Sequence, residues 1–298
     1  MLATLWSKAF AALTALVLLF HTPAPVTPVN PAQPVTPATT RELTVMSYNL
    51  KVSGVGKYAP ARRVPLLAEN IRAWQPDSFG AQECSEFLYQ ALRDALPEYD
   101  SVGLGRDKNN TGEASPVFYL KDKFELTDSG TFWLSETPDT VSKGWDAAYN
   151  RVCTYAVLRE KATGFTYVHF NAHFDHIGAS ARLESVALIT QKAAALCPAL
   201  PFVFTGDLND EEGSVMYQRI LESGMRDAIY LAQETMDAAS YHGYSALTER
   251  MRTKPIDFCF VNDLCTAVAG YTVDLTKYQD IYPSDHHPLI VTLTLGNA

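Results

Sequence analysis

Most motifs that identify a hydrolase at a glance are missing from this chain. It contains no GxSxG nucleophile elbow, no Walker A loop and no HExxH helix. A serine or cysteine nucleophile triad, a P-loop nucleotide site and a zincin metal site are therefore without support. No segment repeats at a period of about 20–50 residues, which excludes solenoid and propeller architectures.

Cysteine and positive charge are also scarce. The five cysteines include no CxxC pair and their number is odd, so we expect small buried residues rather than a disulfide framework. Asp and Glu number 33 against 24 Lys and Arg, which gives a net charge of −9. So acidic a chain disfavours general duplex-DNA binding, which depends on phosphate neutralisation by Lys and Arg. A local cationic patch or a bound metal can still reverse the field at one site.

One long apolar run is present, near the first residue of the sequence. Residues 9–20, AFAALTALVLLF, follow a segment with a single cation, Lys8, and are too few for a comfortable membrane span. The pattern predicts a secretory signal peptide or an uncleaved signal anchor over residues 1–24. Because no AxA-type cleavage site follows, both alternatives stay open. In either case we expect an exported protein that is secreted, periplasmic or membrane-anchored.

A Pro/Thr-rich linker follows at residues 25–40. Its prolines recur every third residue, which matches the three-residue turn of polyproline II and predicts an extended spacer. Residues 41–298 contain no further linker, and their number suits one large domain.

The body mixes strand and helix patterns. Apolar runs rich in β-formers predict strands, and apolar residues at helical spacing predict helices. Strands are expected at 42–50, 78–83, 115–120, 129–135, 151–160, 165–174, 201–209, 256–261 and 288–295, and helices at 60–75, 85–96, 179–196 and 214–223. Hairpins alternate with strand–helix–strand passages, which predicts an α/β fold with two sheets face to face and helices outside.

Polar residues gather where the predicted strands end or begin. They are rich in acids, amides and histidine: Asn49, Glu83, His173, Asp175, Asp207, Asn209, Asp257, Asp285 and His286. If the carboxyl ends of the central strands share one rim, these side chains converge where α/β sheets commonly bind ligands. Carboxylate and amide oxygens select hard divalent cations such as Mg²⁺ or Mn²⁺. Together with histidine donors they suit hydrolysis of a phosphoester by water.

The ordered set resembles the endonuclease/exonuclease/phosphatase superfamily, metal-dependent hydrolases with the deoxyribonuclease-I-like fold. The resemblance rests on MSYNL, AQE, NAHFDH, TGDLN, IDFCFV and SDHHP and spans nearly all of residues 42–295. It implies a four-layer α/β sandwich with two mixed β-sheets face to face and helices outside. The stretches FWLSETP, RVCTYA and NAHFDHIGASARLES are similar to a bacterial, mostly uncharacterised branch, although Tyr155 stands where tryptophan is expected.

The resemblance also implies roles for the acids and amides. Glu83 would be the principal metal ligand, with Asn49 beside it and Asp285 nearby, and the ion would be Mg²⁺ or Mn²⁺. Asp207 would orient or deprotonate the attacking water. Asn209 would hold both the phosphate and Asp207.

Two histidines complete the implied site. His286 and His173 would donate to phosphate oxygens, and Asp257 would orient and charge His286. An adjacent carboxylate raises a histidine's pKa and so favours its doubly protonated form. His287, on the other side of the extended backbone, is expected to be structural.

Candidate substrate contacts are less sharply defined. They are Asp175, Arg151, Arg182 and Trp133. A salt bridge to surface acids is the alternative for the arginines, and a core position is the alternative for the tryptophan. We expect a monomeric phosphoesterase whose substrate is a small molecule or lipid headgroup rather than nucleic acid. The alternatives are an extracellular nuclease with the same site and, more remotely, a non-catalytic surface-binding module.

Overall fold

The computed structural model describes residues 39–297. The signal or anchor predicted at residues 1–24 lies outside this range, as does nearly all of the 25–40 linker. Within the described residues, no helix combines the length and apolar character needed to cross a membrane.

The first sheet has seven strands and mixed pairing. Its spatial order is β12 (Ala232–Met236), β14 (Cys265–Val273), β15 (Leu289–Gly296), β1 (Thr40–Asn49), β2 (Ser78–Gln82), β6 (Val117–Leu120) and β3 (Tyr99–Val102). β1 runs parallel to β2 and antiparallel to β15. The loop before β15 therefore lies next to the carboxyl end of β1.

The second sheet has six strands, also of mixed direction. Its order is β11 (Arg226–Asp227), β13 (Asp257–Val261), β10 (Phe202–Asp207), β9 (Thr166–His173), β8 (Val152–Glu160) and β7 (Phe124–Trp133). β9 and β10 are parallel, and β13 is antiparallel to β10. A small hairpin of β4 (Gly105–Asp107) and β5 (Thr111–Ala114) stands apart from both sheets.

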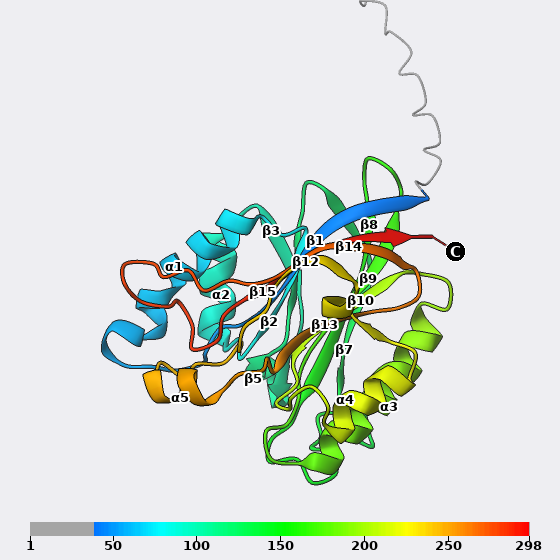
Figure 1. Ribbon diagram of the computed structural model, residues 1–298. Helices are drawn as coiled ribbons and strands as arrows, with labels where there is room; N and C mark the ends of the chain where they lie inside the picture. Colours follow the sequence, from blue (N-terminus) through cyan, green and yellow to red (C-terminus); the bar gives the residue numbers. More distant parts are fainter. Residues whose placement is uncertain (1–38, 298) are drawn as a thin grey trace, which may run out of the picture. The chain divides into compact units, whose positions relative to one another are not determined.

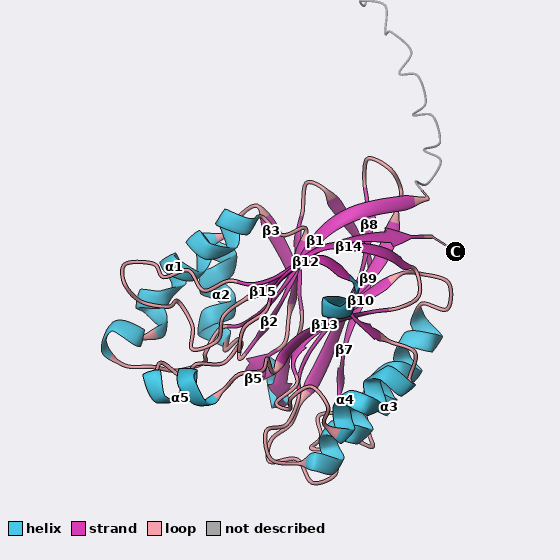
Figure 2. Ribbon diagram, in the orientation of Figure 1, coloured by secondary structure: helices cyan, strands magenta, loops and turns pink. Residues whose placement is uncertain are grey.

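Helices cover the outer face of each sheet (Figure 1). α1 (Pro60–Trp74) and α2 (Glu86–Ala95) pack on the first sheet, where Leu67 and Leu92 join a core with Phe79. α3 (Ala179–Leu196) and α4 (Val215–Glu222) pack on the second, where Ile189 meets Phe204. The two helix pairs lie on opposite sides of the strands (Figure 2), and α5 (Ala246–Met251) belongs to neither pair. The predicted four-layer sandwich is confirmed.

The predicted elements agree well with the observed ones, with some omissions. α2 begins after Ser85, whose Oγ accepts a hydrogen bond from the Leu88 N–H over 3.3 Å, as an N-cap does. All five cysteines are buried and unpaired, as expected. The omitted β14 contains Val268, Tyr271 and Val273, but Ala and Gly residues interrupt the run of β-formers and weaken its signal. Its place in the sheet comes from pairing with β15 and β12.

The two sheets approach closely at Gly80 of β2. A Cβ placed there would lie 2.3 Å from Asn171 Oδ1 and 2.4 Å from Thr205 Oγ1 of the opposite sheet. Polar bonds join the sheets at this level, because Gln82 Nε2 donates to Asn171 Oδ1 over 2.7 Å. Asn171 Nδ2 in turn donates to the Ala81 carbonyl over 2.9 Å. Gly80 therefore fixes how near the strand ends of the two sheets come to each other.

Substituting Gly80→Ala is expected to lower the free energy of unfolding by about 1–3 kcal/mol, the usual cost of overpacking. Urea denaturation followed by tryptophan fluorescence measures this change. The control is Gly270→Ala in β14, where an added Cβ meets nothing within 4 Å. It is expected to change stability by less than about 0.5 kcal/mol. Equal effects of the two substitutions would contradict the close contact at Gly80.

Candidate active site

The polar strand ends of both sheets meet at one cavity. The β-ladders bring them together: Asp207 pairs with His173 of β9 and with Asp257 of β13. Across the sheets, Asn49 Nδ2 donates to Asp207 Oδ2 over 2.8 Å and to Glu83 Oε1 over 3.3 Å. A cavity of about 600 Å³ opens here. Six of the eight predicted catalytic and metal residues line it: Glu83, His173, Asp207, Asn209, Asp285 and His286.

The remaining two residues contact this set from behind. Asn49 contacts Glu83 and Asp207, and Asp257 contacts His286. All eight residues therefore form one connected cluster, as the strand-end pattern predicted. Their chemical roles stay predictions.

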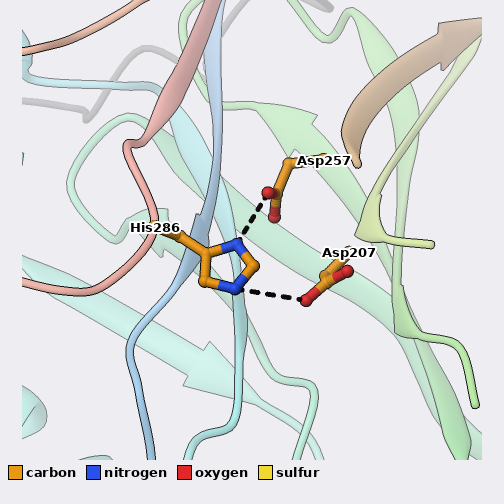
Figure 3. A group of neighbouring side chains, drawn as sticks. All are labelled: Asp207, Asp257 and His286. Carbon is orange, nitrogen blue, oxygen red and sulfur yellow. Dashed lines mark hydrogen bonds and ion pairs between the residues drawn. The ribbon is translucent and has the colours of Figure 1, made fainter. Parts of the chain in front are cut away.

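His286 lies between two carboxylates (Figure 3). Its Nδ1 is 2.8 Å from Asp257 Oδ2, and its Nε2 is 3.7 Å from Asp207 Oδ2. All three residues are buried. Burial alone would lower the pKa of His286, but the charges of Asp257 and Asp207 outweigh it and raise the pKa to about 10. The imidazole is therefore doubly protonated at neutral pH.

Asp207 is buried and faces a second acid, Asp257, across the β-ladder, and both features shift its pKa upward. Burial raises the pKa of Asp207 to about 7, and the charge of Asp257 adds to this effect. The positive charge of His286 and a hydrogen bond from Asn49 act in the other direction. A carboxyl group with a pKa near neutrality is suited to take up a proton from water.

Asn209 and His173 are hydrogen-bonded to each other. Asn209 Nδ2 lies 2.9 Å from His173 Nε2 and donates to the Phe174 carbonyl over 3.0 Å. The NH₂ group of Asn209 has two hydrogens, and it donates one to the Phe174 carbonyl and the other to His173 Nε2. Because Nε2 accepts, the imidazole proton of His173 lies on Nδ1. The Asn209 backbone N–H donates to Asp207 Oδ1 over 3.0 Å. Burial, helped by the charge of Arg151, lowers the pKa of His173 well below its ordinary value, so this imidazole is neutral.

Carboxylate oxygens of Glu83 and Asp285 also line the cavity. Glu83 Oε2 accepts a hydrogen bond from the Val52 N–H over 2.8 Å. Asp285 Oδ2 lies 3.1 Å from Lys51 Nζ, while Asp285 Oδ1 is buried without a hydrogen-bond partner. An unsatisfied buried carboxylate oxygen beside Glu83 fits a site for a hard cation. Asn49 presents its NH₂ group here, and its Oδ1 accepts from the Lys51 N–H over 3.0 Å.

Asp207, Asp257 and His286 also form a compact group, with ligand atoms within 4.8 Å of one another. We do not assign a metal to this group. Both imidazole nitrogens face carboxylates, and a doubly protonated histidine has no lone pair to offer.

The loop that carries Asp285 and His286 is fixed from two sides. Ser284 Oγ donates to the Asn49 carbonyl over 2.6 Å. The fully buried Arg63 of α1 donates through Nη1 to the Pro283 carbonyl over 3.0 Å and also to Leu50, next to Asn49. These bonds tie the loop to the end of β1.

His287 has a separate environment. It packs on His242 and Tyr282, with ring centroids 4.5 and 4.7 Å away. It is not among the residues that line the cavity. The structural role predicted for His287 agrees with this position.

Three predicted substrate contacts lie away from the cavity, which corrects the sequence-based prediction. Asp175 is buried, and its carboxylate accepts bonds from four backbone N–H groups, so it holds its own loop. Arg182 contacts Asp210 and the Asp175 carbonyl. Trp133 is 8% exposed and donates to the Arg106 carbonyl. Only Arg151 of the predicted four lines the cavity, and it also pairs with Asp175 over 3.3 Å.

The cavity has further lining residues beyond the predicted site residues. The charged and aromatic ones among them are Lys51, Arg106, Glu113, Tyr149, His176, Tyr241 and Arg252. Lys51 stands two residues after Asn49, so its place near the site could have been inferred. The others come from loops and from the β4–β5 hairpin, where no strand period fixes the direction of a side chain.

The charge on His286 gives a direct prediction. In Asp257→Asn we expect the pKa of His286 to fall from about 10, because the largest opposing charge is lost. NMR titration of the His286 ring measures this pKa. Asp227→Asn, a buried acid bonded to Tyr217, is the control and should leave His286 unchanged. An unaltered pKa in Asp257→Asn would show that this pair does not charge the histidine.

Comparisons with known proteins place these observations in a family. No family model matches the chain. A curated relative, the uncharacterized protein L388 of Acanthamoeba polyphaga mimivirus, is 26% identical over 169 residues, and the match spans 52% of this chain and 61% of that protein.

Solved structures match more fully. The mannosyl-6-phosphatase Bt3783 of Bacteroides thetaiotaomicron is 34% identical, with 84% of this chain and 99% of that chain covered and a TM-score of 0.78. An endonuclease/exonuclease/phosphatase from Bacteroides vulgatus is 33% identical, with 86% and 99% covered and a TM-score of 0.81. The human nocturnin catalytic domain, 21% identical with 86% and 95% covered and a TM-score of 0.65, shares the fold. The chain belongs to the endonuclease/exonuclease/phosphatase family.

Proposed function

We propose that this protein is a divalent-cation-dependent hydrolase that cleaves a small phosphoester with water. The observation that carries the proposal is the buried Asp207–His286–Asp257 group at a cavity that Glu83 and Asp285 also line. The similarity to a mannosyl-6-phosphatase supports hydrolysis of a phosphoester on a small organic molecule.

The residues divide the chemical work between them. Asp207 takes a proton from the attacking water, for which a pKa near 7 is suitable. The doubly protonated His286 donates from Nε2 to a phosphate oxygen, and Asp257 keeps it charged. Asn209 Nδ2 exchanges its bond to His173 for one to a phosphate oxygen, and the His173 ring then takes the tautomer with its proton on Nε2, from which it donates to the phosphate. The new bond joins the water oxygen to phosphorus and the ester bond breaks. The departing alkoxide takes a proton from bulk water, and Asp207 returns its proton to solvent, so that ester and water give alcohol and phosphate.

The cation would be held by Glu83 and Asp285, with Asn49 joining through Oδ1 once its amide group turns. These oxygen ligands suit Mg²⁺ or Mn²⁺. When bound, such an ion would supply positive charge to the phosphate oxygens. Asp285 Oδ1, which is buried and has no hydrogen-bond partner, is free to ligate such an ion.

A small substrate is favoured over a polymer. A cavity of about 600 Å³ is within the range of small-molecule sites. A nuclease with the same site would need a cationic groove along the strand, and the net charge of −9 argues against one. A lipid headgroup is the second candidate source of the phosphoester. A non-catalytic binding module is disfavoured, since such a module would have no need of the buried acid–histidine group.

Export remains part of the proposal on the strength of the apolar run at 9–20. N-terminal sequencing of the protein from fractionated cells tests it and separates a cleaved signal from an uncleaved membrane anchor. Recovery in the cytosol with residues 1–24 intact would refute export. We also propose a monomer, which light scattering can check.

Glu83→Gln is expected to reduce kcat by about 10²–10³-fold, the usual cost of losing a group that stabilises transition-state charge. Activity is measured on p-nitrophenyl phosphate and bis-p-nitrophenyl phosphate with Mg²⁺ or Mn²⁺, before and after EDTA. We expect EDTA to abolish turnover and added metal to restore it. Glu69→Gln, on the exposed face of α1, is the control and should keep full activity. Activity that survives EDTA would reject the metal-dependent mechanism.

A further inference from the structure

A cationic wall stands beside the predicted phosphate site. Arg106 and Arg151 both line the cavity. With Glu83, Glu113 and His173 they also line a smaller hollow that adjoins it. Arg151 is close enough to His173 for its charge to contribute to lowering the pKa of that imidazole. The two guanidinium groups therefore lie next to residues assigned to the phosphate and the cation.

Arg151 is a buried arginine with fixed partners, unlike an arginine that is free on the surface. It is 5% exposed, and its Nε pairs with Asp175 Oδ2 over 3.3 Å. Its Nη2 lies 3.2 Å from His176 Nδ1. The Asp175 carboxylate also accepts four backbone N–H bonds, which hold this acid in place. Asp175 therefore holds the guanidinium of Arg151 in one direction before any ligand binds.

Arg106 forms the outer part of the same wall. Its Nη1 and Nη2 bind the two oxygens of Glu113 over 3.1 and 2.9 Å. Its guanidinium lies 5.0 Å from the ring centre of Tyr149, which is stacked on His176. The bidentate pair keeps Arg106 at the cavity wall.

The charge of the cavity differs from that of the chain. Its lining holds four Lys and Arg side chains, Lys51, Arg106, Arg151 and Arg252, besides the charged His286, and four acids, Glu83, Glu113, Asp207 and Asp285. The chain as a whole carries a net charge of −9. The cavity thus lacks the negative excess of the chain, and anions meet less repulsion there than elsewhere.

We propose that Arg151, supported by Arg106, binds the third non-bridging oxygen of a terminal phosphate and so makes this enzyme select phosphomonoesters over phosphodiesters. A monoester offers three non-bridging oxygens and a charge near −2 at neutral pH, since its second pKa is about 6. A diester offers two such oxygens and a single charge. A planar guanidinium matches the added oxygen and the added charge. This proposal rests on the phosphoesterase activity proposed above.

The test compares two substrates in one enzyme. Arg151→Gln removes the charge, and we expect kcat/KM for p-nitrophenyl phosphate to fall about 10²-fold or more, as for other anion-stabilising donors. For bis-p-nitrophenyl phosphate we expect a fall below about fivefold, because no third oxygen is present. The ratio of the two values does not depend on the folded fraction, so partial unfolding cannot imitate the result.

Two further variants sharpen the comparison. Arg151→Lys keeps the charge without the planar fork and is expected to lose about tenfold on the monoester. Arg159→Gln in β8 removes an exposed arginine paired with Glu125, and it should leave both substrates unchanged. Equal losses on both substrates in Arg151→Gln would overturn the inference while leaving the proposed hydrolase intact.

A binding measurement separates the two proposals. Calorimetry with inorganic phosphate should show binding to the wild type that weakens at least tenfold in Arg151→Gln. If the wild type hydrolyses neither ester but binds phosphate through Arg151, the proposed function fails and the anion site stands. Phosphate binding that Arg151→Gln leaves unchanged would overturn the anion site itself.

Discussion

The face-to-face packing of two sheets is the constraint on which the site depends. Asn49 and Glu83 come from the first sheet, and Asp207 and His173 from the second, so no single sheet holds a complete site. Gly80 lets the sheets close to the distance at which Asn49 bonds directly to Asp207. Protein cores are packed as densely as organic crystals, so they do not deform gradually. The geometry of the site is therefore a property of the whole sandwich.

The ladder that assembles the site also creates its electrostatics. Asp207 and Asp257 stand opposite each other in adjacent strands, an arrangement that destabilises a sheet when both are charged. His286, inserted from the loop before β15, supplies a positive charge between them. Burial of these groups is tolerated because each has a partner of opposite charge or a hydrogen bond. Against the effect of burial, the charges of the two acids also raise the pKa of His286 to about 10, and burial beside Asp257 raises the pKa of Asp207 to about 7.

Sequence patterns predicted the parts of the site that strands position. A strand gives each side chain a fixed direction, so Asn49, Asp207 and Asp257 could be placed before any fold was known. Loops give no such period. Asp175 lies two residues after His173, where the chain turns, and its carboxylate binds backbone N–H groups. Arg106 lies on a small hairpin outside both sheets, where no strand of the main sheets fixes the direction of its side chain.

Net charge bears on the class of partner only in a coarse sense, because charge acts locally at a site. An acidic surface repels extended polyanions over the reach of the Debye length, about 8–10 Å at ordinary salt. Inside a partly enclosed cavity, low-dielectric walls concentrate the field of the nearest groups. The lining, in which five cations including His286 face four acids, then decides what enters. A compact, highly charged phosphate can meet this lining at every oxygen, whereas a long polymer must also cross the acidic surface around it.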